Sequence, residues 1–224
     1  MAKHFGKIEG LYVIIDPQAC LGRDPVEVGK AALAGGASVL QWRDKLRDKG
    51  EQLAPAKALF EACRSWDATF IVNDHADLAL VLAGETQPNR GAIGVHVGQK
   101  DLPLESLWRI VPDFLVVGAS TNNVEEAEAA EAAGADYVAV GDIFGTSAKA
   151  GTRPASVEVL RQVREAIELP LVAIGGINAD NVAEVIHAGA DAVAVISAVC
   201  AADDPERASK ELVRAIEIAM RFRE

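Results

Sequence analysis

The stretch GADYVAV at residues 134–140 has a close counterpart in GADAVAV at residues 189–195. In both places a glycine follows an alanine-rich segment with helical character, and a short, mostly apolar run begins three residues after the glycine. Glycine there can adopt the left-handed conformation that ends a helix, so the chain can turn directly into the next strand. Each stretch therefore predicts the end of a helix and the start of a buried strand.

Similar short apolar runs occur along the whole chain. Most are apolar on both faces, which is typical of buried parallel strands. The predicted strands are residues 11–15, 38–42, 70–72, 94–97, 115–118, 137–140, 171–174 and 192–195. Helical segments lie between them, most clearly at 124–133, 157–167, 182–188 and 205–222. Eight strands alternating with helices in 224 residues predict an α/β fold, a single-domain (β/α)8 TIM barrel over residues 1–224.

An open, doubly wound sheet is the competing fold for alternating strands and helices. Its first strand normally leads into a glycine-rich turn. Here the first strand is followed by DPQAC at residues 16–20, which contains no glycine. The first junction therefore favours the barrel.

Composition limits the classes of partner. The chain has 22 basic and 33 acidic residues and a formal net charge of −11, which argues against binding nucleic acid or an anionic membrane surface. Small phosphorylated ligands remain possible, because local cations decide their binding. The three cysteines show no metal-binding or disulfide pattern, and neither a secretory signal nor a membrane span is found. We expect a cytoplasmic protein.

In a barrel, the residues that follow the strands meet at one rim, where the chemistry of such proteins takes place. Arg43, Lys45 and Lys149 follow predicted strands, and three cations together suggest a diphosphate or two phosphorylated substrates. Gly175-Gly176 after the seventh strand and Ser197 after the eighth fit a phosphate site. A tight turn and a helix N-cap are the alternative interpretation of those residues.

Two carboxylates, Asp74 and Asp101, follow the neighbouring third and fourth strands. Completed by water and phosphate oxygens, such a pair would form a Mg²⁺ site, although both residues could instead cap helices. His75 and His96 flank the region and could serve as acid or base, but His96 lies within a strand and is as readily a core residue. No histidine spacing indicates zinc.

The order of the motifs at successive strand ends resembles the thiamine-phosphate synthase family. The resemblance extends over nearly the whole chain. Its motifs are QWRDK at 41–45, NDHADLAL at 73–80, GVHVGQKDL at 94–102, GAST at 118–121, GADYVAVGDIF at 134–144, AIGGIN at 173–178 and GADAVAVIS at 189–197.

The resemblance implies a TIM-barrel transferase of thiamine biosynthesis with two phosphorylated small-molecule substrates. It would join 4-amino-5-hydroxymethyl-2-methylpyrimidine diphosphate to a thiazole phosphate, or its carboxylated form, and release diphosphate. Mg²⁺ would be the cofactor, held by Asp74 and Asp101. The implied pyrimidine diphosphate site is Gln41, Trp42, Arg43, Asp44, Lys45, Asn73, Ser120 and Lys149. The implied thiazole phosphate site is Thr146, Ser147, Ala148, Gly176, Ile196 and Ser197.

Positive charge would then drive the reaction, with Arg43, Lys45 and Lys149 stabilising the departing diphosphate. The chain departs from the family pattern at Ala148, where a threonine is usual. Two alternatives stay open: a thiazole tautomerase, which shares the barrel and transfers protons with a histidine, and a barrel that binds phosphorylated thiazole or thiamine phosphate without turnover. A homo-oligomer is a further possibility.

Overall fold

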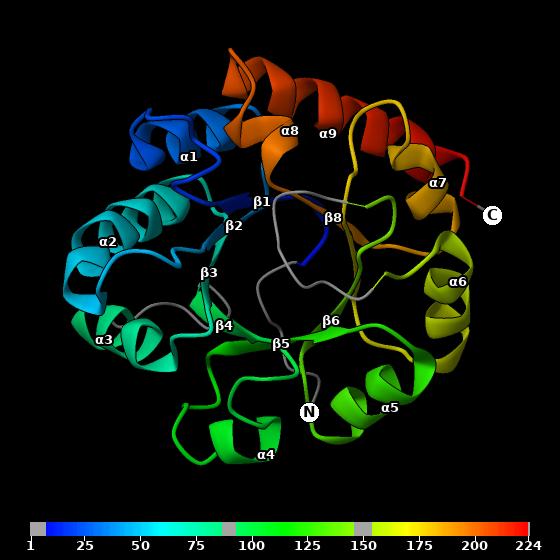
Figure 1. Cartoon of the computed structure of the whole chain (residues 1–224), viewed down its shortest axis with the longest axis horizontal. Helices are drawn as coiled ribbons and strands as arrows, with labels where there is room; N and C mark the ends of the chain where they lie inside the picture. Colours follow the sequence, from blue (N-terminus) through cyan, green and yellow to red (C-terminus); the bar gives the residue numbers. More distant parts are fainter. Residues whose placement is uncertain (1–7, 87–92, 146–153, 224) are drawn as a thin grey trace.

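The computed structural model describes residues 8–86, 93–145 and 154–223. Eight parallel strands form a closed barrel in which each strand pairs with the next and β8 pairs with β1 (Figure 1). This confirms the predicted barrel. The strands are β1 Gly10–Ile15, β2 Val39–Trp42, β3 Thr69–Asn73, β4 Ile93–Val97, β5 Val116–Thr121, β6 Tyr137–Val140, β7 Leu171–Ile174 and β8 Ala192–Val195.

Helices surround the barrel and cover the outer faces of the strands (Figure 1). They are α1 Pro25–Ala34, α2 Lys49–Ser65, α3 Ala76–Thr86, α4 Leu104–Leu107, α5 Val124–Ala132, α6 Val157–Ala166, α7 Val182–His187, α8 Ser197–Cys200 and α9 Pro205–Arg221. Among the described residues, no helix is both long enough and apolar enough to span a bilayer.

The largest departure from the predicted strands is at β5, which continues through Ser120 to Thr121 rather than ending at Gly118. Ser120 and Thr121 pair with Ala139 and Val140 of β6. Backbone pairing does not depend on whether a side chain is apolar, so hydropathy alone places the strand end too early. As a result, Ser120 lies within the barrel wall and not in the loop that follows it.

The core has two layers because the strands are buried on both faces. One layer fills the space between strands and helices, and the other fills the barrel interior, where Tyr12, Ile71 and Tyr137 are among the largest side chains. Side chains alternate between the two layers along each strand.

The two junctions of similar sequence fold alike. Gly134 and Gly189 both have positive φ, 85° and 108°, as predicted for the glycine that ends a helix. The aspartate two residues later accepts a backbone hydrogen bond from the preceding strand: Asp136 from the Val117 N–H at 2.8 Å, and Asp191 from the Leu171 N–H at 2.9 Å. These carboxylates hold neighbouring strands together at the N-terminal ends of the strands.

Candidate active site

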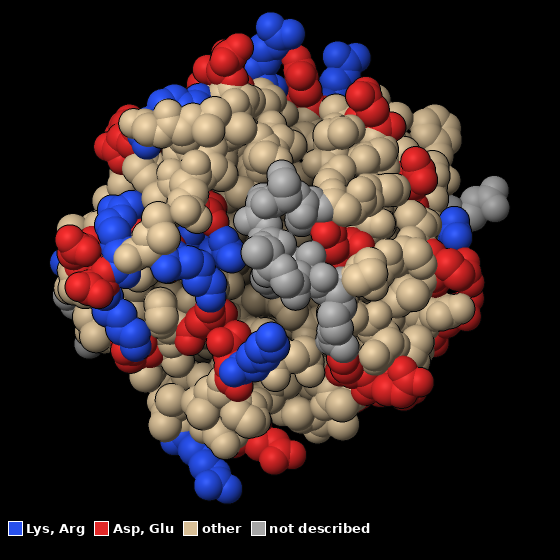
Figure 2. Space-filling model, viewed as in Figure 1, with Lys and Arg blue, Asp and Glu red and all other residues tan. Residues whose placement is uncertain are grey.

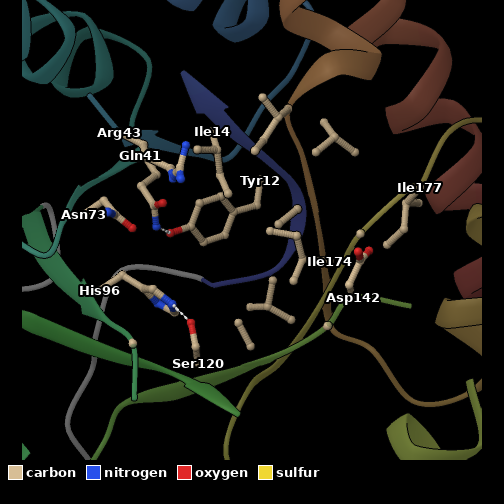
Figure 3. Close-up of a pocket in the computed structure, with 18 of the residues that line it drawn as sticks. Tyr12, Ile14, Gln41, Arg43, Asn73, His96, Ser120, Asp142, Ile174 and Ile177 are labelled. Carbon is tan, nitrogen blue, oxygen red and sulfur yellow. Dashed lines mark hydrogen bonds between the residues drawn. The ribbon is translucent and has the colours of Figure 1, made fainter. Parts of the chain in front are cut away.

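A cavity of about 690 Å³ opens where the strands end, and side chains from all eight strands line it (Figure 3). Most of the residues predicted from the sequence meet there. They are Gln41, Arg43, Lys45, Asn73, Asp74, Asp101, Ser120, Gly176, Ile196 and Ser197. Thr146, Ser147, Ala148 and Lys149 lie outside the described residues. Trp42 and Asp44 are not brought to the cavity.

Trp42 and Asp44 point away from the cavity because side chains alternate along β2, so their neighbours Gln41 and Arg43 face inward. Trp42 is 1% exposed, and its indole N–H donates to Gln52 Oε1 of α2 at 3.2 Å. Asp44 accepts from the backbone N–H of Leu46 at 2.9 Å and is 5% exposed. The structure gives both residues packing and turn-forming roles.

Arg43 forms a buried ion pair with Asp16, which directly follows β1. The side chains of Arg43 and Asp16 are 11% and 6% exposed, and Asp16 also accepts from the Gln18 N–H at 3.0 Å. Because Asp16 is fixed by the backbone, it orients the guanidinium at the cavity wall. Sequence reasoning missed Asp16, although its position just after a strand was a usable signal.

Asp74 and Asp101 lie beside each other at the rim. Burial, followed by the charge of Asp74, raises the pKa of Asp101. Lys45 forms an ion pair with Asp74, and Asp101 accepts from the Gly98 N–H at 2.7 Å. Asp101 is not the cap of α4, whose N-cap is Pro103. The arrangement leaves two carboxylates whose mutual repulsion a divalent cation would relieve, and oxygen ligands of this kind suit Mg²⁺.

Below the rim, hydrogen bonds link side chains across the barrel interior. Gln41 Nε2 lies 2.7 Å from the Tyr12 hydroxyl, which lies 3.0 Å from the Tyr137 hydroxyl. His96 contacts Tyr137 through Nδ1 at 3.0 Å. Through Nε2 it contacts Ser120 at 2.8 Å (Figure 3). His96 is thus a hydrogen-bonded interior residue that also lines the cavity. Sequence reasoning missed both tyrosines, which are the only two in the chain.

The loops after β7 and β8 form another part of the cavity wall. Gly175 and Gly176 have φ of 112° and 64°, and a Cβ on Gly176 would lie 2.4 Å from the Gly145 carbonyl oxygen. Ser197 is the first residue of the short helix α8, whose N-cap is Ile196, so Ser197 is not the N-cap of the alternative interpretation. The wall at the two glycines is mostly backbone, with the Asp142 carboxylate close to Gly175.

Charge is unevenly distributed over the face seen in Figure 2, where Lys and Arg side chains gather on the β2 and β3 side of the centre. Arg43, Lys45 and Lys100 line the cavity, together with the acidic Asp74, Asp101 and Asp142. The site therefore has its own cations within a protein of net charge −11.

Comparisons with known proteins agree with this geometry. The model of the family described as thiamine monophosphate synthase matches residues 11–199. The thiamine-phosphate synthase of Methanospirillum hungatei is 41% identical over 90% of this chain and 95% of its own length, and that of Shouchella clausii is 43% identical over 93% and 97%.

Among solved structures, a thiamine phosphate pyrophosphorylase from Pyrococcus furiosus superposes with a TM-score of 0.83 at 39% identity, covering 94% of this chain and 96% of that one. Sequence and fold thus agree over almost the full length of the chain, and the family match extends from β1 into α8. The chain belongs to the thiamine monophosphate synthase family.

Proposed function

We propose that this thiamine-phosphate synthase joins 4-amino-5-hydroxymethyl-2-methylpyrimidine diphosphate to a thiazole phosphate, in its simple or carboxylated form, and releases diphosphate. One observation carries the proposal: cations and a pair of carboxylates from β2, β3 and β4 converge on a single cavity. A diphosphate leaving group needs such an arrangement, since negative charge builds on it as it departs.

The diphosphate would lie at the rim, against Arg43 and Lys45, with Lys149 as a third cation. Arg43 can contact two phosphate oxygens at once because Asp16 holds its guanidinium in place. Asp74 and Asp101 would hold Mg²⁺, which supplies positive charge to the diphosphate oxygens when bound. Lys45 would exchange its contact with Asp74 for one with the diphosphate.

The pyrimidine would lie deeper, against Gln41, Asn73 and Ser120, in a part of the cavity enclosed by the barrel wall. The bond between the exocyclic CH₂ and the diphosphate oxygen breaks, and its electron pair leaves with the diphosphate. The electron-rich aminopyrimidine stabilises the cation that remains. The thiazole nitrogen then donates its lone pair to the CH₂ carbon and forms the new C–N bond.

The thiazole phosphate would bind at Gly176, Ile196 and Ser197, which follow β7 and β8 and line the same cavity. Contacts from Thr146, Ser147 and Ala148 remain predictions from the sequence. Anchoring the second substrate by its phosphate would place its nitrogen near the CH₂ carbon, which lowers the entropic barrier to the reaction. A covalent nucleophile is not required, and all three cysteines are buried away from the cavity.

The test is to supply both substrates with and without Mg²⁺ and to measure thiamine phosphate. Asp74 has a φ of 60°, so Asp74→Asn is a better variant than alanine, since asparagine tolerates this conformation and lacks the charge. We expect Asp74→Asn to lose Mg²⁺-dependent turnover by at least about tenfold and to keep its fold. Asp77→Asn, an exposed residue of α3 paired with Lys49, is the matched control.

Full activity of Asp74→Asn would refute the metal assignment. Thiazole phosphate binding without any product would favour a binding barrel, and thiazole isomerisation would favour a tautomerase.

A further inference from the structure

A chain of amide, phenol and imidazole groups crosses the barrel below the cavity, and the chemistry proposed above does not use its middle members. It runs from Gln41 through Tyr12, Tyr137 and His96 to Ser120, with contacts of 2.7, 3.0, 3.0 and 2.8 Å. Tyr12, Tyr137 and His96 are 2%, 0% and 7% exposed. Both ends of this hydrogen-bond chain, Gln41 and Ser120, line the cavity.

If every hydroxyl proton is donated within this hydrogen-bond chain, its hydrogen bonds all point the same way. Burial raises the pKa of both tyrosines, so each hydroxyl is neutral and has a single proton to donate. If the Gln41 amide donates to Tyr12, then Tyr12 donates to Tyr137, and Tyr137 donates to Nδ1 of His96. A neutral imidazole then carries its proton on Nε2 and donates to Ser120 Oγ.

The direction of the chain decides what each end offers to a ligand. With Gln41 donating to Tyr12, its Oε1 atom faces the cavity as an acceptor, and no described residue hydrogen-bonds that atom. Ser120 accepts from His96, so its own proton is free to point toward a ligand. Reversing the chain would exchange the two roles: Gln41 would offer N–H donors to the cavity, and Ser120 would offer only lone pairs.

We propose that Tyr12, Tyr137 and His96 are positioning residues that set this polarity, so that the cavity accepts hydrogen bonds at Gln41 and donates them at Ser120. The substrate part of the inference rests on the function proposed above. A 4-aminopyrimidine donates from its amine and accepts at its ring nitrogens, which complements this polarity. A 4-oxopyrimidine has the opposite pattern, a carbonyl acceptor beside a ring N–H, and is rejected.

The barrel fixes the centre of the chain in place. Gly118 of β5 faces the ring of Tyr137, and a Cβ there would lie 2.0 Å from Cζ and 2.5 Å from the hydroxyl oxygen. Tyr137 also stacks on His96, with ring centroids 5.5 Å apart. A glycine at this position leaves room for the Tyr137 ring, whose hydroxyl contacts both Tyr12 and His96.

The first test reads the His96 tautomer by nitrogen-15 NMR of histidine-labelled protein without substrate. The protein has four histidines, and the His96→Gln variant identifies the signals of His96. We expect the proton on Nε2 in the wild type. In Gln41→Glu at about pH 9, far above the ordinary glutamate pKa of about 4.3, the carboxylate can only accept from Tyr12. The chain must then reverse, and Nδ1 of His96 must gain a proton.

Tyr137→Phe interrupts the hydrogen-bond chain. It therefore separates an effect transmitted through these hydrogen bonds from a direct effect of the new charge. We expect Gln41→Glu to leave Nδ1 unprotonated in the Tyr137→Phe background. Ser209→Ala, which removes a fully buried hydroxyl on α9, is the control and should leave the His96 signals unchanged. The inference is overturned if Nδ1 of His96 stays unprotonated in Gln41→Glu, or if it gains a proton equally well without the Tyr137 hydroxyl.

The second test compares kcat/KM for the 4-amino substrate and its 4-oxo analogue. Tyr137→Phe should reduce the preference for the amino form by about tenfold or more, while Ser209→Ala keeps it. An unchanged preference in Tyr137→Phe counts against the substrate role. Failure of the wild type to make thiamine phosphate would instead refute the proposed function, and the tautomer measurements would be unaffected by that result.

Discussion

The orientation and the pKa of single residues at the rim depend on residues from other parts of the sequence. Arg43 is held by Asp16, and Asp101 is perturbed by Asp74. Buried ion pairs and paired carboxylates both place charge where water is scarce, and there a neighbouring group changes the energy of a charge most. The clearest measurable consequence belongs to Asp101.

Asp101→Asn should stabilise the protein at neutral pH when no divalent cation is present. Because its pKa is raised on folding, ionised Asp101 costs stability, and this cost grows as the pH rises from about 4 through the raised pKa. The variant avoids the cost. Thermal melts across pH should therefore show a higher Tm than wild type at neutral pH, with the difference vanishing toward pH about 4.

Adding Mg²⁺ should reverse that order, because a cation that binds only the folded wild type stabilises it by mass action. Asp203→Asn, at an exposed position between α8 and α9, serves as the control and should follow the wild type throughout. A wild-type Tm insensitive to Mg²⁺ would contradict the assignment of Asp74 and Asp101 as ligands.

At the scale of elements, close approach between neighbouring strands decides where small residues are needed. Gly118 of β5 lies against the ring of Tyr137 at the start of β6. The Tyr137 ring occupies the space that a side chain at position 118 would fill. Packing in such an interior is dense, and an added methyl group has to displace its neighbours.

Gly118→Ala should lower the free energy of unfolding by about 1–3 kcal/mol, since the new Cβ overlaps the Tyr137 ring. Urea titration followed by circular dichroism measures the change. Gly84→Ala is the matched control: nothing lies within 4 Å of a Cβ there, and helix α3 should gain up to about 1 kcal/mol. Equal effects of the two substitutions would disprove the packing argument.

For the whole molecule, the two ends of the barrel have separate tasks. The strands end at the cavity and begin at a ring of contacts that hold the elements together. Asp191, just before β8, bonds to Arg164 at 3.1 Å and to Arg223 at 3.2 Å, besides its contact with Leu171. One carboxylate thereby joins β7 to residues at the end of α6 and after α9.

Asp191→Asn should therefore affect stability and leave substrate affinity alone. The variant loses the charge that pairs with two arginines, and we expect the free energy of unfolding to fall by about 1–3 kcal/mol. KM for both substrates, measured well below the Tm, should match the wild type. A raised KM with an unchanged Tm would show that the two ends of the barrel are coupled.

Much of the fold follows from the sequence, because it depends on local rules. Apolar runs of strand length, helical spacing and glycines such as Gly134 and Gly189 each act within a few residues, and they predicted all eight strands and their order. Once the barrel is known, the rule that strand ends meet at one rim brought Arg43, Lys45, Asp74 and Asp101 together correctly.

The sequence could not show which way a side chain points or which distant residues it contacts. Motif membership grouped Trp42 and Asp44 with Gln41 and Arg43, but the alternation of side chains along the barrel wall sends the first two outward. Contacts such as Tyr12 to Tyr137, 125 residues apart, exist only because barrel closure brings β1 and β6 to face each other across the interior. The sequence alone thus determined the barrel and its rim, while tertiary structure decided which side chains face the cavity and which groups orient them, since hydrogen bonds form between atoms that are close in space.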